Sequence, residues 1–181
     1  EICREHPRFH NWYADVLETG LGLCCEETAR LILTAPEPFA LVELPDLPDE
    51  AEEPDPALEI LREVRAEIFR FLESPTLLLA DRLERLTALG WTLQHHLMDG
   101  DQLPALCREA LRRPAALAPL TSADGAALLG TAQGLERLSD EWETLLAQAE
   151  AEPTRFLLPA ASPEEEAELS RIALYLVYRY F

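Results

Sequence analysis

The segment from Leu79 to Leu97 reads LADRLERLTALGWTLQHHL and repeats leucine at steps of three and four residues. Steps of this size place the leucines on one face of an α-helix and leave arginine and glutamate outside. Similar apolar spacing occurs in three further segments, at residues 61–71, 135–149 and 169–180. The sequence therefore predicts an all-α fold, in which amphipathic helices pack as a multi-helix bundle.

Residues that favour a helix start stand before two of these segments. Ser74-Pro75 supplies an N-cap and a first-turn proline, which predicts that the helix containing Leu79 begins there. Ser162-Pro163 is followed by Glu164 and Glu165, so a carboxylate stands at the capping-box position of the last helix. Both patterns agree with the helical interpretation.

Other residue types complete this coarse prediction. Residues 39–44 are the only ones that alternate like a strand, and that segment is short. The three tryptophans fit apolar stripes and are predicted to be core aromatics; they are Trp12, Trp91 and Trp142.

One acidic segment divides the chain. Residues 43–59 contain eight acidic residues, four prolines and no basic residue. Such a composition cannot bury enough apolar surface to order itself, which predicts an acidic Pro-rich linker or loop at residues 43–56. The linker separates a short cysteine-bearing N-terminal segment, 1–42, from a helical body, 57–181.

The charge of the chain excludes several function classes. Fifteen basic residues, all arginine, face 34 acidic residues, which gives a net charge of −19. A chain this acidic should repel phosphate backbones, so nucleic acid is a poor partner. The absence of lysine removes Schiff-base chemistry and a Walker-type phosphate loop. The acidity could attract a basic protein substrate, although a solvated surface is the simpler interpretation.

The sequence also predicts the surroundings of the protein. No run approaches the roughly 18 to 20 apolar residues that a membrane-spanning helix needs, so no membrane partner is expected. Four cysteines in 181 residues are few for a disulfide scaffold, and the chain shows no signal-peptide pattern. We therefore expect a reducing, cytoplasmic location. The chain begins at Glu1 and ends within the apolar run 172–181, so we expect truncations at both ends.

The most specific residues lie in the first 33 positions. Residues 3–9 read CREHPRF, and residues 21–33 read LGLCCEETARLIL after an acidic residue, Glu18. These two blocks resemble those of the flagellin lysine N-methylase family. Weaker matches follow at residues 62–69, 80–86 and 175–181, the last reading YLVYRYF. Thr28 departs from the pattern, because the family usually has alanine there.

This resemblance implies a function. The chain would be the C-terminal, mostly helical portion of an S-adenosylmethionine-dependent enzyme that methylates lysine side chains of flagellin, and alone it would be inactive. The family also implies a cysteine-ligated iron–sulfur cluster whose ligands lie largely upstream. Cys3 and Cys25 match recurring family cysteines and are the candidate metal ligands, whereas His6 and Cys24 are weaker candidates. Catalytic and cofactor-binding residues stay unassigned.

Physical reasoning leaves alternatives open. An iron–sulfur cluster or a zinc site normally needs four ligands, and Cys3 and Cys25 supply two. His6 and His10 have ligand-like spacing after Cys3 and could complete a zinc site with Cys25. Both cysteines could instead be small buried side chains. A non-catalytic metal-binding or protein-interaction helical domain is therefore the alternative function, and the oligomeric state stays open.

Overall fold

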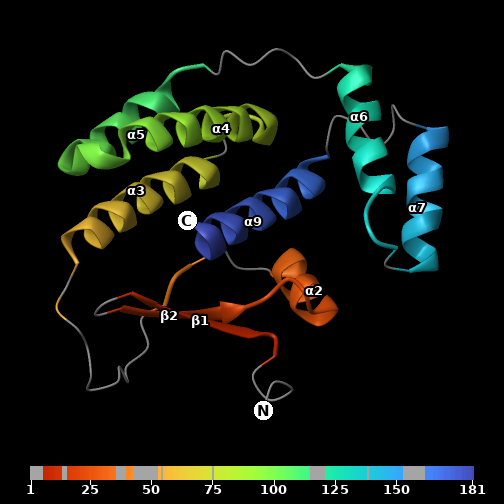
Figure 1. The fold of residues 1–181 in the computed structure, drawn as a ribbon, viewed down its shortest axis with the longest axis horizontal. Helices are drawn as coiled ribbons and strands as arrows, with labels where there is room; N and C mark the ends of the chain where they lie inside the picture. The colour runs from red at the N-terminus through yellow and green to blue at the C-terminus, as the bar shows by residue number, and fades with distance from the viewer. Residues whose placement is uncertain are drawn as a thin grey trace. The chain divides into compact units, whose positions relative to one another are not determined.

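The protein is mostly helical, with one small sheet (Figure 1). The computed structural model describes residues 6–13, 16–35, 40–42, 53, 55–74, 76–114, 121–137, 139–152 and 162–181. This confirms the predicted helical class, whereas the bundle arrangement and the division at the acidic linker stay predictions. The candidate ligand Cys3 and most of the acidic segment lie outside the described residues.

The chain forms two compact units. The first comprises Glu1–Ala115 and Pro163–Phe181, and the second comprises Ala116–Ser162. The described elements of the first unit are β1 (Arg8–Tyr13), β2 (Val16–Leu21), α2 (Glu26–Thr34), α3 (Pro56–Glu73), α4 (Leu79–His96), a 3-10 helix (Leu97–Gln102), α5 (Leu103–Arg112) and α9 (Pro163–Tyr180). The second unit contains α6 (Ser122–Gln133) and α7 (Asp140–Ala151).

The core of the first unit lies between α3, α4, α5 and α9. Helix α3 packs against α5 and α9, and α4 packs against α5. The residues that fill this core are Val64, Ile68, Leu72, Leu89, Leu93, Leu103, Cys107, Leu111, Ala173 and Leu174. The predicted stripe at residues 61–71 therefore does face the core, and Cys107 of α5 is also a core residue.

On α4 the buried face differs from the predicted one at one turn. Leu83 is 39% exposed, whereas Arg82 is only 5% exposed. The Arg82 guanidinium donates to the Leu72 backbone carbonyl and, at 3.3 Å, to Ser170 Oγ. The last carbonyls of a helix lack partners within the helix, so a buried arginine can satisfy the end of α3. The assumption that every arginine lies outside was wrong.

Helix α4 also begins later than Ser74-Pro75 predicted. Ser74 instead ends α3, where its N–H donates to the Phe71 carbonyl at 3.3 Å. The N–H of Leu79, the first residue of α4, donates to the carboxylate of Glu166 in α9 at 3.1 Å. A residue 87 positions away thus satisfies the start of this helix, which a local capping pattern cannot reveal.

Helix α9 begins at Pro163 as predicted but buries a different face. Leu169, Leu176 and Tyr180 of the predicted stripe are exposed, and the residues Ala173, Leu174 and Tyr175 are buried. The reason is that α9 contacts both α2 and α3, so its buried surface is broad and includes a tyrosine with a polar end.

The sheet is a two-stranded hairpin that the sequence did not predict. Strands β1 and β2 pair antiparallel from Arg8 opposite Leu21 to Tyr13 opposite Val16. Of the predicted strand, residues 40–42 are described and are not part of a strand. The hairpin was not predicted because a glycine and several polar residues interrupt the apolar alternation of its strands. Trp12 on β1 and Trp91 on α4 are 62% and 66% exposed, so neither is a core aromatic.

In the described part of the second unit, α6 and α7 both have well-formed starts. The Thr121 side chain and Asp124 form a reciprocal capping box at α6, and Ser139 caps α7 by accepting from Trp142 N at 3.2 Å. The predicted stripe at 135–149 only partly holds, because α7 begins at Asp140 and Leu135 and Leu145 are exposed. Across the described part of the chain, no helix has the length and apolar character needed to cross a membrane.

Candidate functional site

The hairpin brings the two specific sequence blocks side by side. The Gly22 N–H, directly after β2, donates to the Pro7 carbonyl, directly before β1, at 2.7 Å. The turn that carries Cys24 and Cys25 therefore lies beside the chain at His6 and Pro7. Cys24 is exposed, Cys25 is half-buried, and both are free thiols. His6 is exposed before β1 and His10 is exposed on it.

Cys25 occupies the N-cap position of α2. Its thiol pKa is lowered mainly by the backbone N–H of Thr28 and then by the Thr28 hydroxyl, although neither contact has the geometry of a standard cap hydrogen bond. Donors at a helix start favour the thiolate, which is the form that nucleophiles and metal ligands need. Thr28 is buried and supplies both of these donors.

The described residues do not complete a metal site. No group of three or more histidine, cysteine or acidic side chains within the described ranges is arranged to hold a metal ion. Cys25 suits the role of one thiolate ligand, and Cys24 is adjacent. A cluster needs about four ligands, so the described donor set alone does not fit one.

Helix α9 holds the hairpin and the cysteine turn in place. The Tyr175 hydroxyl accepts from the Leu23 N–H at 3.2 Å, and the Tyr178 hydroxyl donates to the Thr19 carbonyl at 2.8 Å. Arg171 Nη1 donates to the Leu33 carbonyl at 2.6 Å, near the end of α2. The helix that carries the YLVY residues thus contacts both the strand before the cysteines and the helix after them.

Aromatic and cationic side chains pack between β1 and α9. The Phe9 and Tyr178 ring centroids are 5.8 Å apart, and the Arg179 guanidinium lies 4.2 Å from the Phe9 centroid. A side chain at Gly20 would collide here, because a Cβ would lie 2.7 Å from Phe9 Cζ and 3.1 Å from Tyr178 Cε1. The glycine in β2 therefore leaves the space in which Phe9 and Tyr178 pack.

A buried ion pair joins β2 to α3. Arg65 binds Glu18 through both guanidinium nitrogens, with Nη1 to Oε2 at 2.9 Å, and the side chains are 8% and 11% exposed. The Arg65 guanidinium also lies 5.8 Å from the Tyr178 ring centroid. Burial, and then the Glu18 carboxylate, raises the pKa of Tyr178, so its hydroxyl stays protonated and able to donate.

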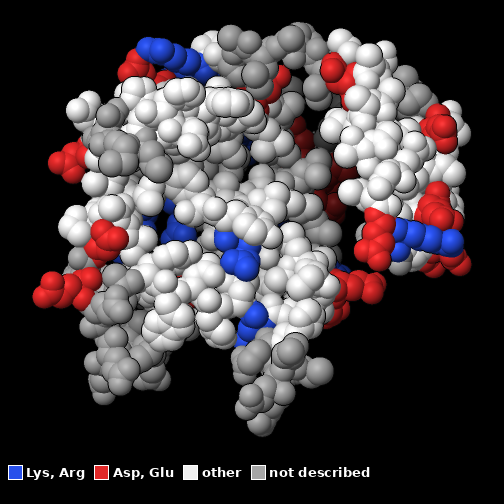
Figure 2. Space-filling model, viewed as in Figure 1, with Lys and Arg blue, Asp and Glu red and all other residues white. Residues whose placement is uncertain are grey.

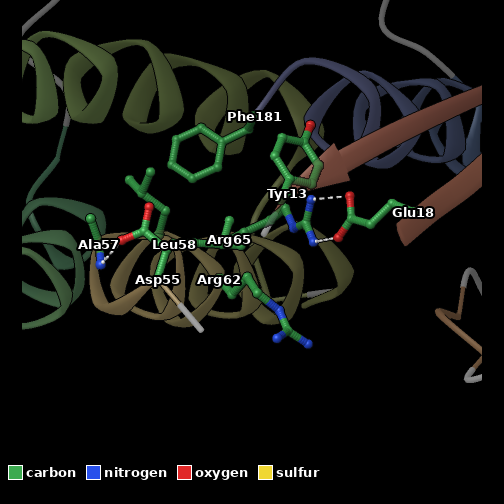
Figure 3. A pocket seen from close by; sticks show the side chains of 9 residues that line it. Tyr13, Glu18, Asp55, Ala57, Leu58, Arg62, Arg65 and Phe181 are labelled. Carbon is green, nitrogen blue, oxygen red and sulfur yellow. Dashed lines mark hydrogen bonds and ion pairs between the residues drawn. The ribbon is translucent and has the colours of Figure 1, made fainter. Parts of the chain in front are cut away.

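A pocket of about 270 Å³ lies at the turn end of the hairpin, opposite the cysteine end (Figure 3). The lining comes from the hairpin, α3 and the C-terminal residue, and comprises Tyr13, Glu18, Asp55, Ala57, Leu58, Leu61, Arg62, Arg65 and Phe181. Five residue steps along the strand separate the two ends of the hairpin, which is about 17 Å at about 3.3 Å per residue. Cys24 and Cys25 and the pocket thus lie at opposite ends of the hairpin.

The sequence indicates the cysteine turn and the acidic residue Glu18 before it, but it does not predict the pocket. Asp55-Pro56 has the N-cap and first-turn-proline pattern that could have located the start of α3 and one wall of the pocket. The pairing of Glu18 with Arg65, 47 positions apart, has no local signal.

No family model matches the chain, and neither a curated protein nor a solved structure matches it.

Proposed function

We propose that this chain is part of a cytoplasmic, S-adenosylmethionine-dependent protein-lysine N-methyltransferase that acts on flagellin. S-adenosylmethionine supplies the methyl group in such a reaction. The residues of this chain would support and orient the site, and among the described residues no group of three or more metal-ligating side chains is arranged to hold a metal ion. This portion alone is expected to be inactive.

One observation carries the proposal. The sequence blocks on which the resemblance depends are far apart in the chain, yet Tyr175 and Tyr178 hydrogen-bond the backbone at Leu23 and Thr19. These contacts support the interpretation that the two blocks are parts of one structural unit, in which the YLVY helix fixes the cysteine turn.

In this unit Cys25 would serve as one thiolate ligand of an iron–sulfur cluster completed by Cys3 and upstream residues. The half-buried position of Cys25 and its lowered pKa support this role. Cys24 is next to Cys25 in the sequence and His6 is three residues after Cys3, so each could replace its neighbour as a ligand. No methyl-transfer step is assigned to the cluster.

The test is the iron and sulfide content of the natural full-length protein, purified without oxygen. Cys25→Ser and Cys3→Ser should each lower both contents, whereas Cys107→Ala should not, because Cys107 is buried in the core away from this turn. Cys24→Ser shows whether the neighbouring thiol substitutes for Cys25. Equal iron and sulfide in all four variants would contradict a ligand role for these cysteines.

A protein-interaction domain without catalysis is the second candidate. The exposed aromatic side chains Trp12, Trp91 and Tyr180 favour it, because aromatic residues are enriched at protein interfaces. An assay for methylated lysine in flagellin separates the two functions, since an interaction domain would bind its partner and leave it unmodified.

A further inference from the structure

The lining of the pocket beside α3 combines apolar and charged side chains. Leu58 and Leu61, in the first turns of α3, form the apolar part of the lining together with the rings of Tyr13 and Phe181. Figure 3 shows both rings and Leu58. A volume of about 270 Å³ lies just below the range of about 300 to 1,000 Å³ that holds drug-sized ligands. The pocket therefore suits one long side chain better than a whole nucleotide-bearing cofactor.

The charges around the pocket leave one carboxylate without a cationic partner. Arg65 is neutralised by Glu18, and Arg62 points away from the two rings (Figure 3). Asp55 accepts from the Ala57 N–H at 2.9 Å through one oxygen. No side chain in the described ranges bonds its other oxygen, which is available to a ligand.

Apolar walls, two aromatic rings and one carboxylate are the features that recognise an alkylammonium group. The methylene stem of a lysine packs on leucine and aromatic surfaces, while its ammonium favours a carboxylate and an aromatic face. An anionic ligand would meet the Asp55 charge, and a purely apolar ligand would leave that charge without a partner.

We propose that this pocket receives the side chain of the target lysine, with the ammonium at Asp55 and the stem between Leu58 and the rings of Tyr13 and Phe181. This inference deepens the proposed function and rests on it for the identity of the ligand. Asp55 is a positioning and binding residue here, and no proton transfer is assigned to it.

The experiment is an NMR titration of the chain with N-acetyl-L-lysine N-methylamide, in the absence of S-adenosylmethionine. The probe should shift ring resonances of Tyr13 and Phe181, and the matching norleucine amide, which lacks the ammonium, should bind more weakly. Asp55→Asn should weaken lysine binding about fivefold, which corresponds to about 1 kcal/mol. Asparagine caps helices about as well as aspartate, so this variant keeps the start of α3.

The matched control is Asp81→Asn, which removes an exposed carboxylate from the first turn of α4 and should leave lysine binding unchanged. Three results would overturn the inference: no lysine binding, equal binding of the norleucine amide, or equal weakening by both variants. The titration contains no S-adenosylmethionine, so it tests lysine binding separately from methylation. If lysine binding depends on Asp55 but the full-length protein does not methylate flagellin, only the proposed function is contradicted. If the full-length protein methylates flagellin and Asp55→Asn leaves the KM for flagellin unchanged, only the assignment of the pocket is contradicted.

Discussion

Arg65 and Glu18 place two full charges in the interior between α3 and the hairpin. Removing charges from water costs several kcal/mol, and good geometry between the partners offsets this cost. The pair is bidentate and lies next to Tyr178, so its geometry is favourable. Its purpose is best explained as fixing where the hairpin attaches to α3, because the same two residues line the pocket.

We predict that Glu18→Gln destabilises the protein by about 3 kcal/mol, because it leaves the Arg65 cation buried without a counter-charge. Urea denaturation followed by circular dichroism measures this change. The double replacement Glu18→Leu with Arg65→Met should regain most of the lost stability, since no buried charge remains.

The control for this prediction is Glu27→Gln, which breaks the exposed ion pair between Glu27 and Arg30. Solvent screens exposed pairs, so its denaturation midpoint should hardly move. If Glu18→Gln unfolds at the same urea concentration as Glu27→Gln, the buried pair does not anchor the hairpin.

The two described thiols with shifted pKa values should react differently in the metal-free chain. The Cys25 pKa is lowered by Thr28, so alkylation of Cys25 should reach its half-maximal rate below the pH typical of a free thiol. Burial, and then Glu67, raises the pKa of Cys107 to about 11, and Cys107 should stay unmodified until the protein unfolds.

Thr28→Val tests the cause of the Cys25 shift. It removes the hydroxyl donor but keeps the backbone N–H, so the pH of half-maximal alkylation should rise only part of the way toward the ordinary value. Thr34→Val, which loses a hydroxyl that donates to the Arg30 carbonyl in the same helix, is the control. A Thr28→Val curve that overlays the unmodified protein would show that the hydroxyl has no influence on Cys25.

At the scale of elements, α9 organises the first unit. It caps the start of α4 through Glu166, contacts α2 near its end through Arg171 and holds the hairpin through Tyr175 and Tyr178. The terminal element of the sequence thus joins the first elements to the middle ones. Such long-range contacts explain why α9 buries Tyr175 and leaves Leu176 exposed.

Tyr175→Phe is expected to loosen the cysteine turn without unfolding the core. It leaves the Leu23 N–H without its partner, at a cost of about 1 kcal/mol. Hydrogen exchange at the Leu23 amide should therefore accelerate about fivefold, while amides in the middle of α3 keep their protection. Tyr180→Phe, at a position that is 77% exposed, serves as the control and should leave Leu23 unchanged. Unchanged exchange at Leu23 in Tyr175→Phe would contradict the anchoring role of α9.

The sequence predicted elements best where the apolar period is regular. The stripe at 61–71 and most of the stripe at 79–97 do face the core, because leucine and isoleucine have no other favourable place. The prediction failed where buried side chains have polar ends. Arg82 is buried because its guanidinium donates to a backbone carbonyl at the end of α3. The buried face of α9 likewise includes Tyr175. The hairpin was missed because its partners lie on α3 and α9, far away in sequence.

The candidate site was predictable only in part, for the same reason. The cysteine turn is local, so its motif is visible in residues 21–33, whereas the pocket is assembled from β1, β2, α3 and Phe181. Only the Asp55-Pro56 helix start gives a local trace of it.

At the scale of the whole molecule, the net charge of −19 suits both a solvated surface and a basic partner. On the face shown in Figure 2, acidic side chains of the described residues occur at several separate places. The proposed recognition of a lysine therefore depends on the single carboxylate at Asp55 and not on a broad acidic surface.

We propose that this chain belongs to an enzyme that methylates lysine side chains of flagellin. The most direct measurement is mass spectrometry of flagellin after incubation with the natural full-length protein and S-adenosylmethionine. We expect methyl groups to appear on flagellin lysines only when both S-adenosylmethionine and the protein are present. Unmodified flagellin, from a preparation that retains stoichiometric iron and sulfide, would contradict it.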